Sequence, residues 1–291
     1  MNNGFSFQRP LGLVLSGGGS LGAWQAGCLH ALIRAGLSFD HVLGFSSGAL
    51  NGALYFLRRE HELLERWQAI EDQRILRFSP SWNSRSIFSS DPIWKIVDFT
   101  RDERSIRRDA QCLFTIISLC LEDGMPVYAR FSPPGQGAWD SPLSSWLVAS
   151  CAIPYIFPAI SIEVRGKPRH FVDGGVPGRE WMRFDALAEC KDIIVLEMVR
   201  SDEIGRKRWG PLARLEQKSR EIVRRQMDSG IGSLRSLERS PRVFRVQPFR
   251  RLEYYELSFR SKHCVPAIEQ GIADGTQFMS QCAAEPSDSR S

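Results

Sequence analysis

The chain lacks any apolar run long enough to cross a bilayer, and its beginning lacks the pattern of a secretory signal. The longest apolar runs, at 116–121 and 193–196, have the length of strands, whereas a membrane-spanning helix needs about 20 apolar residues. The first five residues contain no basic stretch followed by an apolar one, which argues against a cleaved leader peptide. We therefore expect a soluble, cytoplasmic protein.

The sequence also lacks cysteines at the spacing of a metal-binding or redox motif. Seven cysteines are scattered along the chain without C-x-x-C spacing. Such a set indicates free thiols in a reducing compartment and excludes a disulfide-rich scaffold. Internal repeats and low-complexity linkers are absent as well, so no domain boundary is compelling. A chain of 291 residues with 43% hydrophobic composition fits one large globular domain.

Positive charge is concentrated in the last third of the chain. Residues 200–262 hold 17 Lys/Arg against 8 Asp/Glu, a balance of +9 in a chain whose net charge is +5. A region this basic could meet an anionic membrane or a nucleic acid, or it could be a solvated, salt-bridged surface. Part of it, 211–228, has the spacing of an amphipathic helix, which would either lie on a lipid surface or pack on the sheet.

The first 70 residues alternate between strand and helix patterns. Residues 11–16 are predicted as a buried strand, and after three glycines a helix is predicted over 22–35. A second strand at 41–43 is followed by a long helix at 47–70. This alternation favours an α/β fold with a parallel sheet covered on both faces.

Later elements are less regular. The stretch 82–108 is polar and is predicted as loop with a short helix. The other predictions are hairpins at 113–131 and 160–172, a short helix at 143–151, a buried strand at 191–198, a final helix at 265–279 and a disordered tail at 283–291.

A G-x-S-x-G motif, GFSSG at 44–48, lies between the second strand and the helix that follows it. A serine on such a strand-to-helix turn is exposed and strained, and the flanking glycines let neighbouring backbone approach closely. Ser46, at the centre of the motif, is therefore a candidate nucleophile.

A glycine-rich string, GGGSLG at 17–22, follows the first strand and opens a helix. The N–H groups of such a loop, together with the helix N-terminus, favour an anion or an oxyanion. Three hypotheses follow. The loop is an oxyanion hole, a dinucleotide-binding loop with Asp40 as the ribose contact, or a tight turn without a ligand.

An Asp-Gly-Gly turn at 173–175 ends another strand and places the carboxylate of Asp173 on a sharp bend. A Ser-His-Asp triad would need a histidine beside Ser46. His263 lies in a polar stretch without the context of a site, and His170 is a neighbour of Asp173 on the same strand. A serine–aspartate dyad therefore remains.

Together the motifs resemble those of the patatin-like phospholipases. That family carries a G-G-G-x-[K/R]-G loop, a G-x-S-x-G elbow and a D-G-[G/A] motif, and this chain has GGGSLG, GFSSG and DGG in the same order. The string ASCAIPYIFP at 149–158 is similar to the family segment before the aspartate. The resemblance covers residues 11–200.

The resemblance implies a role for each matching residue. Ser46 would be the nucleophile and Asp173 its general base, without histidine. The oxyanion hole would be formed by the N–H groups of Gly17, Gly18 and Gly19. The glycines that would support the motifs are Gly22, Gly44, Gly48, Gly174 and Gly175.

The family fold is a three-layer α/β/α sandwich with a mainly parallel central sheet, and its members cleave acyl esters of phospholipids and other lipids. By resemblance we expect a lipid substrate, no metal or organic cofactor, peripheral contact with an anionic membrane as an open alternative, and no nucleic acid. The catalytic core would span 11–200, with a basic helical region, 201–282, packed on the same domain.

Two residues depart from the family pattern. Leu21 stands where the family usually has Lys or Arg, which removes a positive charge near the oxyanion loop. Phe45 stands before the nucleophile, where a small residue or Thr is common, and is expected to narrow the acyl pocket. These departures motivate a second hypothesis, a catalytically silent lipid-binding protein of this type. A dinucleotide-binding protein is the third.

Overall fold

The computed structural model describes residues 6–203 and 210–284, and its centre is an eight-stranded sheet. The strand order is β10-β9-β1-β2-β5-β8-β7, with β6 paired to β5. The parallel strands are β1 (Leu11–Leu15), β2 (His41–Gly44), β5 (Leu113–Cys120), β9 (Asp192–Leu196) and β10 (Arg242–Val246). The strands added by antiparallel pairing are β6 (Pro126–Phe131), β7 (Ile160–Val164) and β8 (Lys167–Asp173).

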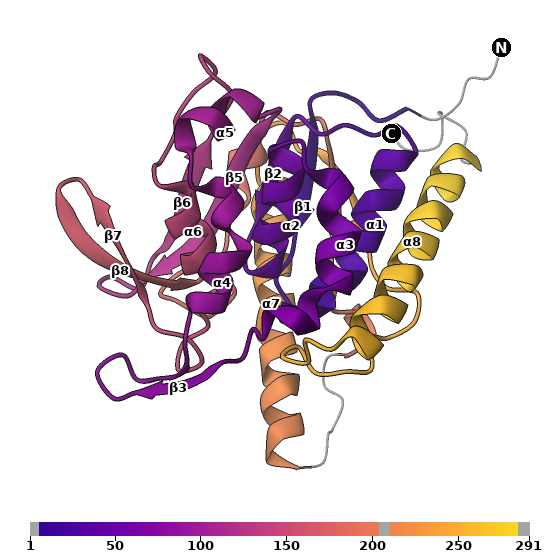
Figure 1. Ribbon diagram of the computed structural model, residues 1–291. Helices are drawn as coiled ribbons and strands as arrows, with labels where there is room; N and C mark the ends of the chain where they lie inside the picture. Colours follow the sequence, from indigo (N-terminus) through magenta and orange to yellow (C-terminus); the bar gives the residue numbers. More distant parts are fainter. Residues whose placement is uncertain (1–5, 204–209, 285–291) are drawn as a thin grey trace.

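Helices cover both faces of this sheet (Figure 1). One face carries α1 (Gly22–Arg34), α2 (Ser47–Phe56), α3 (Leu63–Gln68) and α8 (Ser261–Ala284), whereas α7 (Pro211–Arg235) lies behind the sheet. The other helices are α4 (Asp91–Ile96), α5 (Glu103–Asp109) and α6 (Leu143–Ser150). No helix in the described ranges is long and apolar enough to span a bilayer.

The two faces of the sheet build two separate cores, because successive side chains of a strand point in opposite directions. In β1, Leu13 and Leu15 belong to the larger core beneath α1 and α2, whereas Val14 belongs to the smaller core that α7 covers. In β9, Ile194 and Ile193 divide in the same way. The expected α/β sandwich with a mainly parallel sheet is thus confirmed.

The prediction of a single helix over 47–70 is wrong, because the helix is broken in the middle of this range. The helix α2 ends at Phe56, and Arg58 takes the left-handed conformation with a φ of 57°. The chain then turns back into α3, where the Trp67 Nε1–H donates to Asn51 Oδ1 on α2 at 2.8 Å. The break therefore folds α3 against α2 instead of extending it.

Three strands were missed by the sequence patterns. The hairpin of β3 (Phe78–Ser81) and β4 (Ser86–Phe88) lies outside the main sheet, and β4 falls within the stretch predicted as loop. The strand β10 was missed because Arg242 and Arg245 interrupt its apolar residues and break the alternation typical of a strand. The two C-terminal helices are longer than predicted. Of the predicted tail, 283–284 belong to α8 and 285–291 lie outside the described residues.

The amphipathic helix α7 packs on the sheet instead of facing lipid. Val223 and Met227 are buried in the smaller core. Arg220 is fully buried and pairs with Glu203 at 2.8 Å and with Glu216 at 3.0 Å. Of the two alternatives for 211–228, packing on the sheet is therefore confirmed. Arg220, which a lipid-facing helix would direct to head groups, is instead used in internal ion pairs.

Candidate active site

The nucleophile elbow joins β2 to α2 and holds Ser46 at a φ of 54° and a ψ of −135°. Two glycines make this sharp turn sterically possible. A Cβ on Gly44 would lie 2.8 Å from the Gly48 carbonyl oxygen, and a Cβ on Gly48 would collide with the backbone of β1. The Ser46 N–H donates to Ser150 Oγ at 2.9 Å, which fixes the elbow against α6. Backbone strain of this kind is concentrated at functional sites, and the G-x-S-x-G turn is one of them.

Asp173 ends β8 and reaches the same point from the other side of β5. The Ser46 side chain lies beside its carboxylate, and the Gly175 N–H donates to Oδ1 at 2.7 Å. Burial raises the pKa of Asp173 to about 6, although the Gly175 N–H and the Ser46 side chain both act to lower it. The carboxylate is thus a stronger base than an exposed one, yet it is mostly ionised at pH 7.

The glycine loop lies directly against the elbow. A Cβ on Gly17 would approach the Phe45 ring at 2.7 Å and Ser46 Cβ at 2.9 Å, and one on Gly19 would collide with the Glu256 carbonyl. The amides that flank the loop are used, since Ser16 N–H donates to Leu196 and Ser20 N–H to Glu256. Within the described residues, the three amides of 17–19 donate to no carbonyl, so they are free to meet a ligand beside Ser46.

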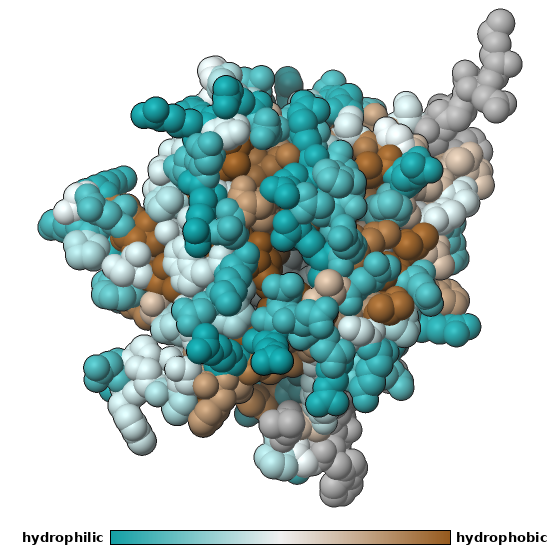
Figure 2. All heavy atoms as spheres, viewed as in Figure 1, coloured by the Kyte–Doolittle hydropathy of each residue, from teal (hydrophilic) through white to brown (hydrophobic). Residues whose placement is uncertain are grey.

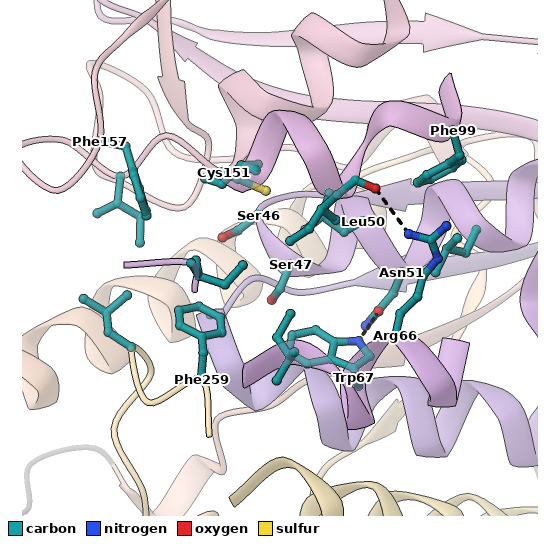
Figure 3. Close-up of a pocket in the computed structure, with 18 residues that line it drawn as sticks. Ser46, Ser47, Leu50, Asn51, Arg66, Trp67, Phe99, Cys151, Phe157 and Phe259 are labelled. Atoms are coloured by element: carbon teal, nitrogen blue, oxygen red, sulfur yellow. Dashed lines mark hydrogen bonds between the residues drawn. The ribbon is translucent and has the colours of Figure 1, made fainter. Parts of the chain in front are cut away.

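A narrow apolar pocket of about 80 Å³ opens at the elbow (Figure 3). Ser46 lies in its wall, with Cys151 and Phe157 on one side and Phe259 on another. The apolar lining comes mainly from α2, α3, α4 and two loops, and includes Leu50, Leu54, Ile70, Ile75, Ile93, Ile96, Phe99, Ile153 and Leu257. Such a space accepts a hydrocarbon chain and excludes water from the serine.

Arg66 and Cys151 also line the pocket. Arg66 lies in the pocket wall with its guanidinium 4.8 Å from the Phe99 ring centroid, and it donates to the Ile96 carbonyl at 3.3 Å. Burial and the nearby Asp173 raise the pKa of Cys151 well above its usual value. Because the thiolate is the reactive form of cysteine, Cys151 is a lining residue and not a competing nucleophile.

The structure brings Ser46, Asp173 and the loop 17–19 together, as the motifs predict. Gly174 and Gly175 also fit their places, since a Cβ on Gly174 would lie 2.6 Å from the Ile117 carbonyl oxygen. Gly22 is needed for packing, because a Cβ there would lie 2.6 Å from the Trp67 ring.

Phe45 does not narrow the pocket, and that expectation is wrong. Its ring belongs to the smaller core, under the glycine loop, and it does not line the cavity. Leu21 is also completely buried, in the larger core. Both departures from the family pattern are therefore packing residues.

Asp40 and the histidines stay away from the site. Asp40 lies directly before β2, whereas the glycine loop follows the end of β1. Because β1 and β2 are parallel, Asp40 and the loop lie at opposite ends of these strands. Asp40 pairs with Arg9 at 2.7 Å, and its predicted ribose contact is wrong. In the described ranges no histidine bonds Ser46 or Asp173, and His263 instead contacts Ser258 Oγ at 2.8 Å.

Sequence reasoning missed the strap, as we call residues 252–259, which follows β10. The Ser20 N–H donates to the Glu256 carbonyl at 2.7 Å, and Ser20 Oγ donates to the Tyr255 carbonyl at 3.1 Å. Leu257 and Phe259 complete the pocket wall. Nothing in the local sequence reports this role, because it depends on contacts more than 200 residues apart.

A family model and several known proteins match parts of this chain. The family model described as patatin-like phospholipase matches residues 13–177. The chain is similar to lysophospholipase nte1 of Aspergillus terreus, with 53% identity over 47 residues that cover 16% of this chain and 3% of the relative. It is also similar to neuropathy target esterase sws of Drosophila persimilis, with 51% identity over 51 residues that cover 18% of this chain and 4% of the relative.

Solved structures give a more distant likeness. VipD from Legionella pneumophila aligns over 94% of this chain and 67% of its own, with a TM-score of 0.45 and 12% identity. ExoU, in its complex with SpcU from Pseudomonas aeruginosa, aligns over 96% of this chain and 53% of the other, with a TM-score of 0.41 and 15% identity. At these values the likeness carries no argument about activity.

Proposed function

The chain belongs to the patatin-like phospholipase family, and we propose that it is a serine lipid acyl hydrolase that works through a Ser46–Asp173 dyad. The proposal rests on one observation above the others. The Ser46 side chain lies beside a buried carboxylate whose pKa is raised to about 6, at the wall of an apolar pocket. A serine, a base and a place for an acyl chain are thus found in one site.

The first half of the reaction forms an acyl-enzyme. Asp173 takes the proton of Ser46 Oγ as that oxygen attacks the ester carbonyl carbon. The carbonyl oxygen becomes an oxyanion, which the free amides of Gly17, Gly18 and Gly19 stabilise. The C–O bond to the alcohol then breaks, and Asp173 gives its proton to the departing alkoxide oxygen.

The second half returns the free enzyme. A water molecule enters where the alcohol left, and Asp173 removes its proton as the oxygen attacks the acyl carbon. Collapse of the second tetrahedral intermediate releases the carboxylic acid and returns a proton to Ser46 Oγ. This scheme uses no cofactor, and the substrate class that we infer is an acyl ester of a phospholipid or lysophospholipid, since the relatives include a lysophospholipase.

Labelling with a fluorophosphonate probe tests this proposal. We expect one adduct, mapped by mass spectrometry to Ser46 and absent from Ser46→Ala. Asp173→Asn should lower the labelling rate and the hydrolysis of lipid esters by about 10²–10⁴-fold, the usual contribution of a general base. Asp185→Asn, a change at an exposed carboxylate outside the site, is the matched control.

Three outcomes would overturn the proposal. An adduct on another residue, or full hydrolysis by folded Asp173→Asn, would remove the dyad. Absence of any adduct from the folded wild-type protein, with vesicles present, would instead favour the catalytically silent lipid-binding protein. In that case the pocket would hold an acyl chain without turning it over.

A further inference from the structure

The β3–β4 hairpin exposes large apolar side chains that nothing in the described structure covers. Phe78 is 72% exposed and Trp82, in the turn, is 96% exposed, and Ile87 on β4 is also exposed. Tyr155, on the loop that pairs with β4, is 71% exposed. Single exposed apolar residues are ordinary, but a group of this size on one protrusion marks an interaction site.

The hairpin stands away from the body of the molecule. Figure 1 shows it extending beyond the layer of helices, and the same protrusion is visible at the lower left of Figure 2. Its two strands pair with each other and with the neighbouring loop, not with the main sheet. Its exposed side chains can therefore become buried against a partner without any rearrangement of the two hydrophobic cores.

Positive charge surrounds the exposed aromatic residues. The segment 74–88 contains Arg74, Arg77 and Arg85 and no acidic residue. Arg77 pairs with the exposed Asp91 at 3.5 Å. Aromatic residues flanked by basic ones are the pattern of a protein segment at a lipid–water interface, where the rings enter the head-group layer and the cations meet phosphate groups.

A direct path of contacts connects this hairpin to the pocket. The Phe78 and Phe88 rings are 6.3 Å apart, and those of Phe88 and Phe157 are 6.5 Å apart. The Phe88 N–H also donates to the Ile156 carbonyl at 2.9 Å, so β4 is bonded to the loop that carries Phe157. Since Phe157 lines the pocket beside Ser46 (Figure 3), the exposed rings are joined to the pocket wall.

We propose that the β3–β4 hairpin, with Trp82 at its tip, docks this protein on a lipid surface and places the Ser46 pocket beside that surface. This proposal rests on the proposed function, because a lipid substrate gives the docking its use. The partner is a phospholipid layer, and anionic head groups should strengthen the contact through the arginines of 74–88. Membrane contact, which the sequence left open for the basic C-terminal third, is thus assigned to the β3–β4 hairpin instead.

Vesicle co-sedimentation tests the docking without turnover. Every protein carries Ser46→Ala so that the vesicles stay intact, and the vesicles are phosphatidylcholine alone or mixed with phosphatidylglycerol. We expect Phe78→Ser/Trp82→Ser to weaken partitioning at least about tenfold, as transfer of two large apolar side chains requires. The matched control is Trp181→Ser, which changes a tryptophan that is 44% exposed outside the hairpin and should preserve partitioning.

A second pair of measurements separates charge from burial of the rings. Arg77→Gln/Arg85→Gln should weaken binding to the anionic vesicles and leave binding to pure phosphatidylcholine unchanged. With Ser46 restored, Phe78→Ser/Trp82→Ser should hydrolyse a soluble short-chain ester at the wild-type rate and a vesicle-borne ester more slowly. Equal loss on both esters would show a damaged fold or site and would overturn the docking role.

Other results would also refute the proposal. If neither vesicle binds the protein, or if the double variant partitions like the wild type, the hairpin does not dock on lipid. If instead light scattering shows a dimer that Trp82→Ser abolishes, a second copy of the chain is its partner. These results leave Ser46 labelling unaffected, so the docking and the esterase proposals fail separately.

Discussion

Asp173 and Arg220 are both buried charged residues, but their surroundings differ in kind. Within the described residues no cation pairs with Asp173, whose carboxylate accepts from the Gly175 N–H and lies beside the Ser46 side chain. Arg220, on α7, pairs with Glu203 and Glu216. The pKa of Asp173 is raised by burial, whereas nearby carboxylates raise the pKa of Arg220 in spite of its burial. The comparison indicates that one region retains a reactive charge and the other neutralises its charges.

The largest effect that separates these regions should be on turnover. Asp173→Asn removes the proposed base and should lower kcat by about 10²–10⁴-fold. The free energy of unfolding at pH 7 should stay the same or rise, because the change removes a buried charge that has no cation beside it. Steady-state kinetics and urea unfolding of the same preparation measure both quantities. A strong loss of stability would mean that Asp173 mainly supports the fold.

Arg220→Met should instead change mainly the free energy of unfolding. Removing this guanidinium leaves the buried Glu216 without its partner among the described residues and leaves Glu203 with Arg251 alone. Breaking a buried ion pair in this way typically costs about 3–5 kcal/mol of unfolding free energy. Urea unfolding at pH 7 checks this value. Arg220 also donates to the carbonyls of Leu252 and Tyr254, so the strap should loosen as well. An unchanged unfolding midpoint would contradict the ion-pair assignment.

The pH dependence of stability and of activity should run in opposite directions at Asp173. Its pKa is about 6 in the folded protein and 3.8 in the unfolded reference, so the folded state binds more protons between these values. Stability relative to Asp173→Asn should therefore fall as the pH rises from about 4 to about 6. The turnover rate should rise over the same range, because the base must be ionised. Matched pH series of unfolding and of hydrolysis test both signs.

The smallest effect should come from an exposed ion pair. Arg101 contacts Asp98 on the surface, and such pairs contribute about 0–1 kcal/mol. Arg101→Met should thus shift the unfolding free energy by no more than about a third of the Arg220→Met effect. If the two substitutions cost the same, burial does not explain the Arg220 result.

Much of the chemistry could be predicted from the sequence, because it resides in short motifs whose backbone geometry is local. The strand before Gly17, the elbow at Ser46 and the turn at Asp173 each carry their own glycines, and each is where the motifs place it. The roles of these residues in catalysis remain proposals. Local patterns also sufficed for β5 with β6 and for β7 with β8, because each pair is joined by a short connection.

The pocket could not be predicted in the same way. Its walls combine Trp67, Phe99, Phe157 and Phe259, which come from four separate segments. The turn at Arg58, which brings α3 onto the pocket, has no glycine or proline to announce it. The strap shows that residues beyond 200 also line the pocket. Because β10 extends the same sheet, we propose that 11–200 and 201–282 form one domain.

The pairing of α1 with α8 has a consequence for biosynthesis. A Cβ on Gly27 would collide with the Ile268 carbonyl, and one on Gly271 with the Trp24 carbonyl, so the two backbones touch. The buried hydrogen bond from Trp24 to Asp274 joins positions 250 residues apart. At a translation rate of roughly 5–20 residues per second, the ribosome needs about 12–50 s to make that interval. During this time α8 is not yet available to pack on the apolar side of α1 in the nascent chain. A chaperone that binds this side should therefore raise the yield of active protein.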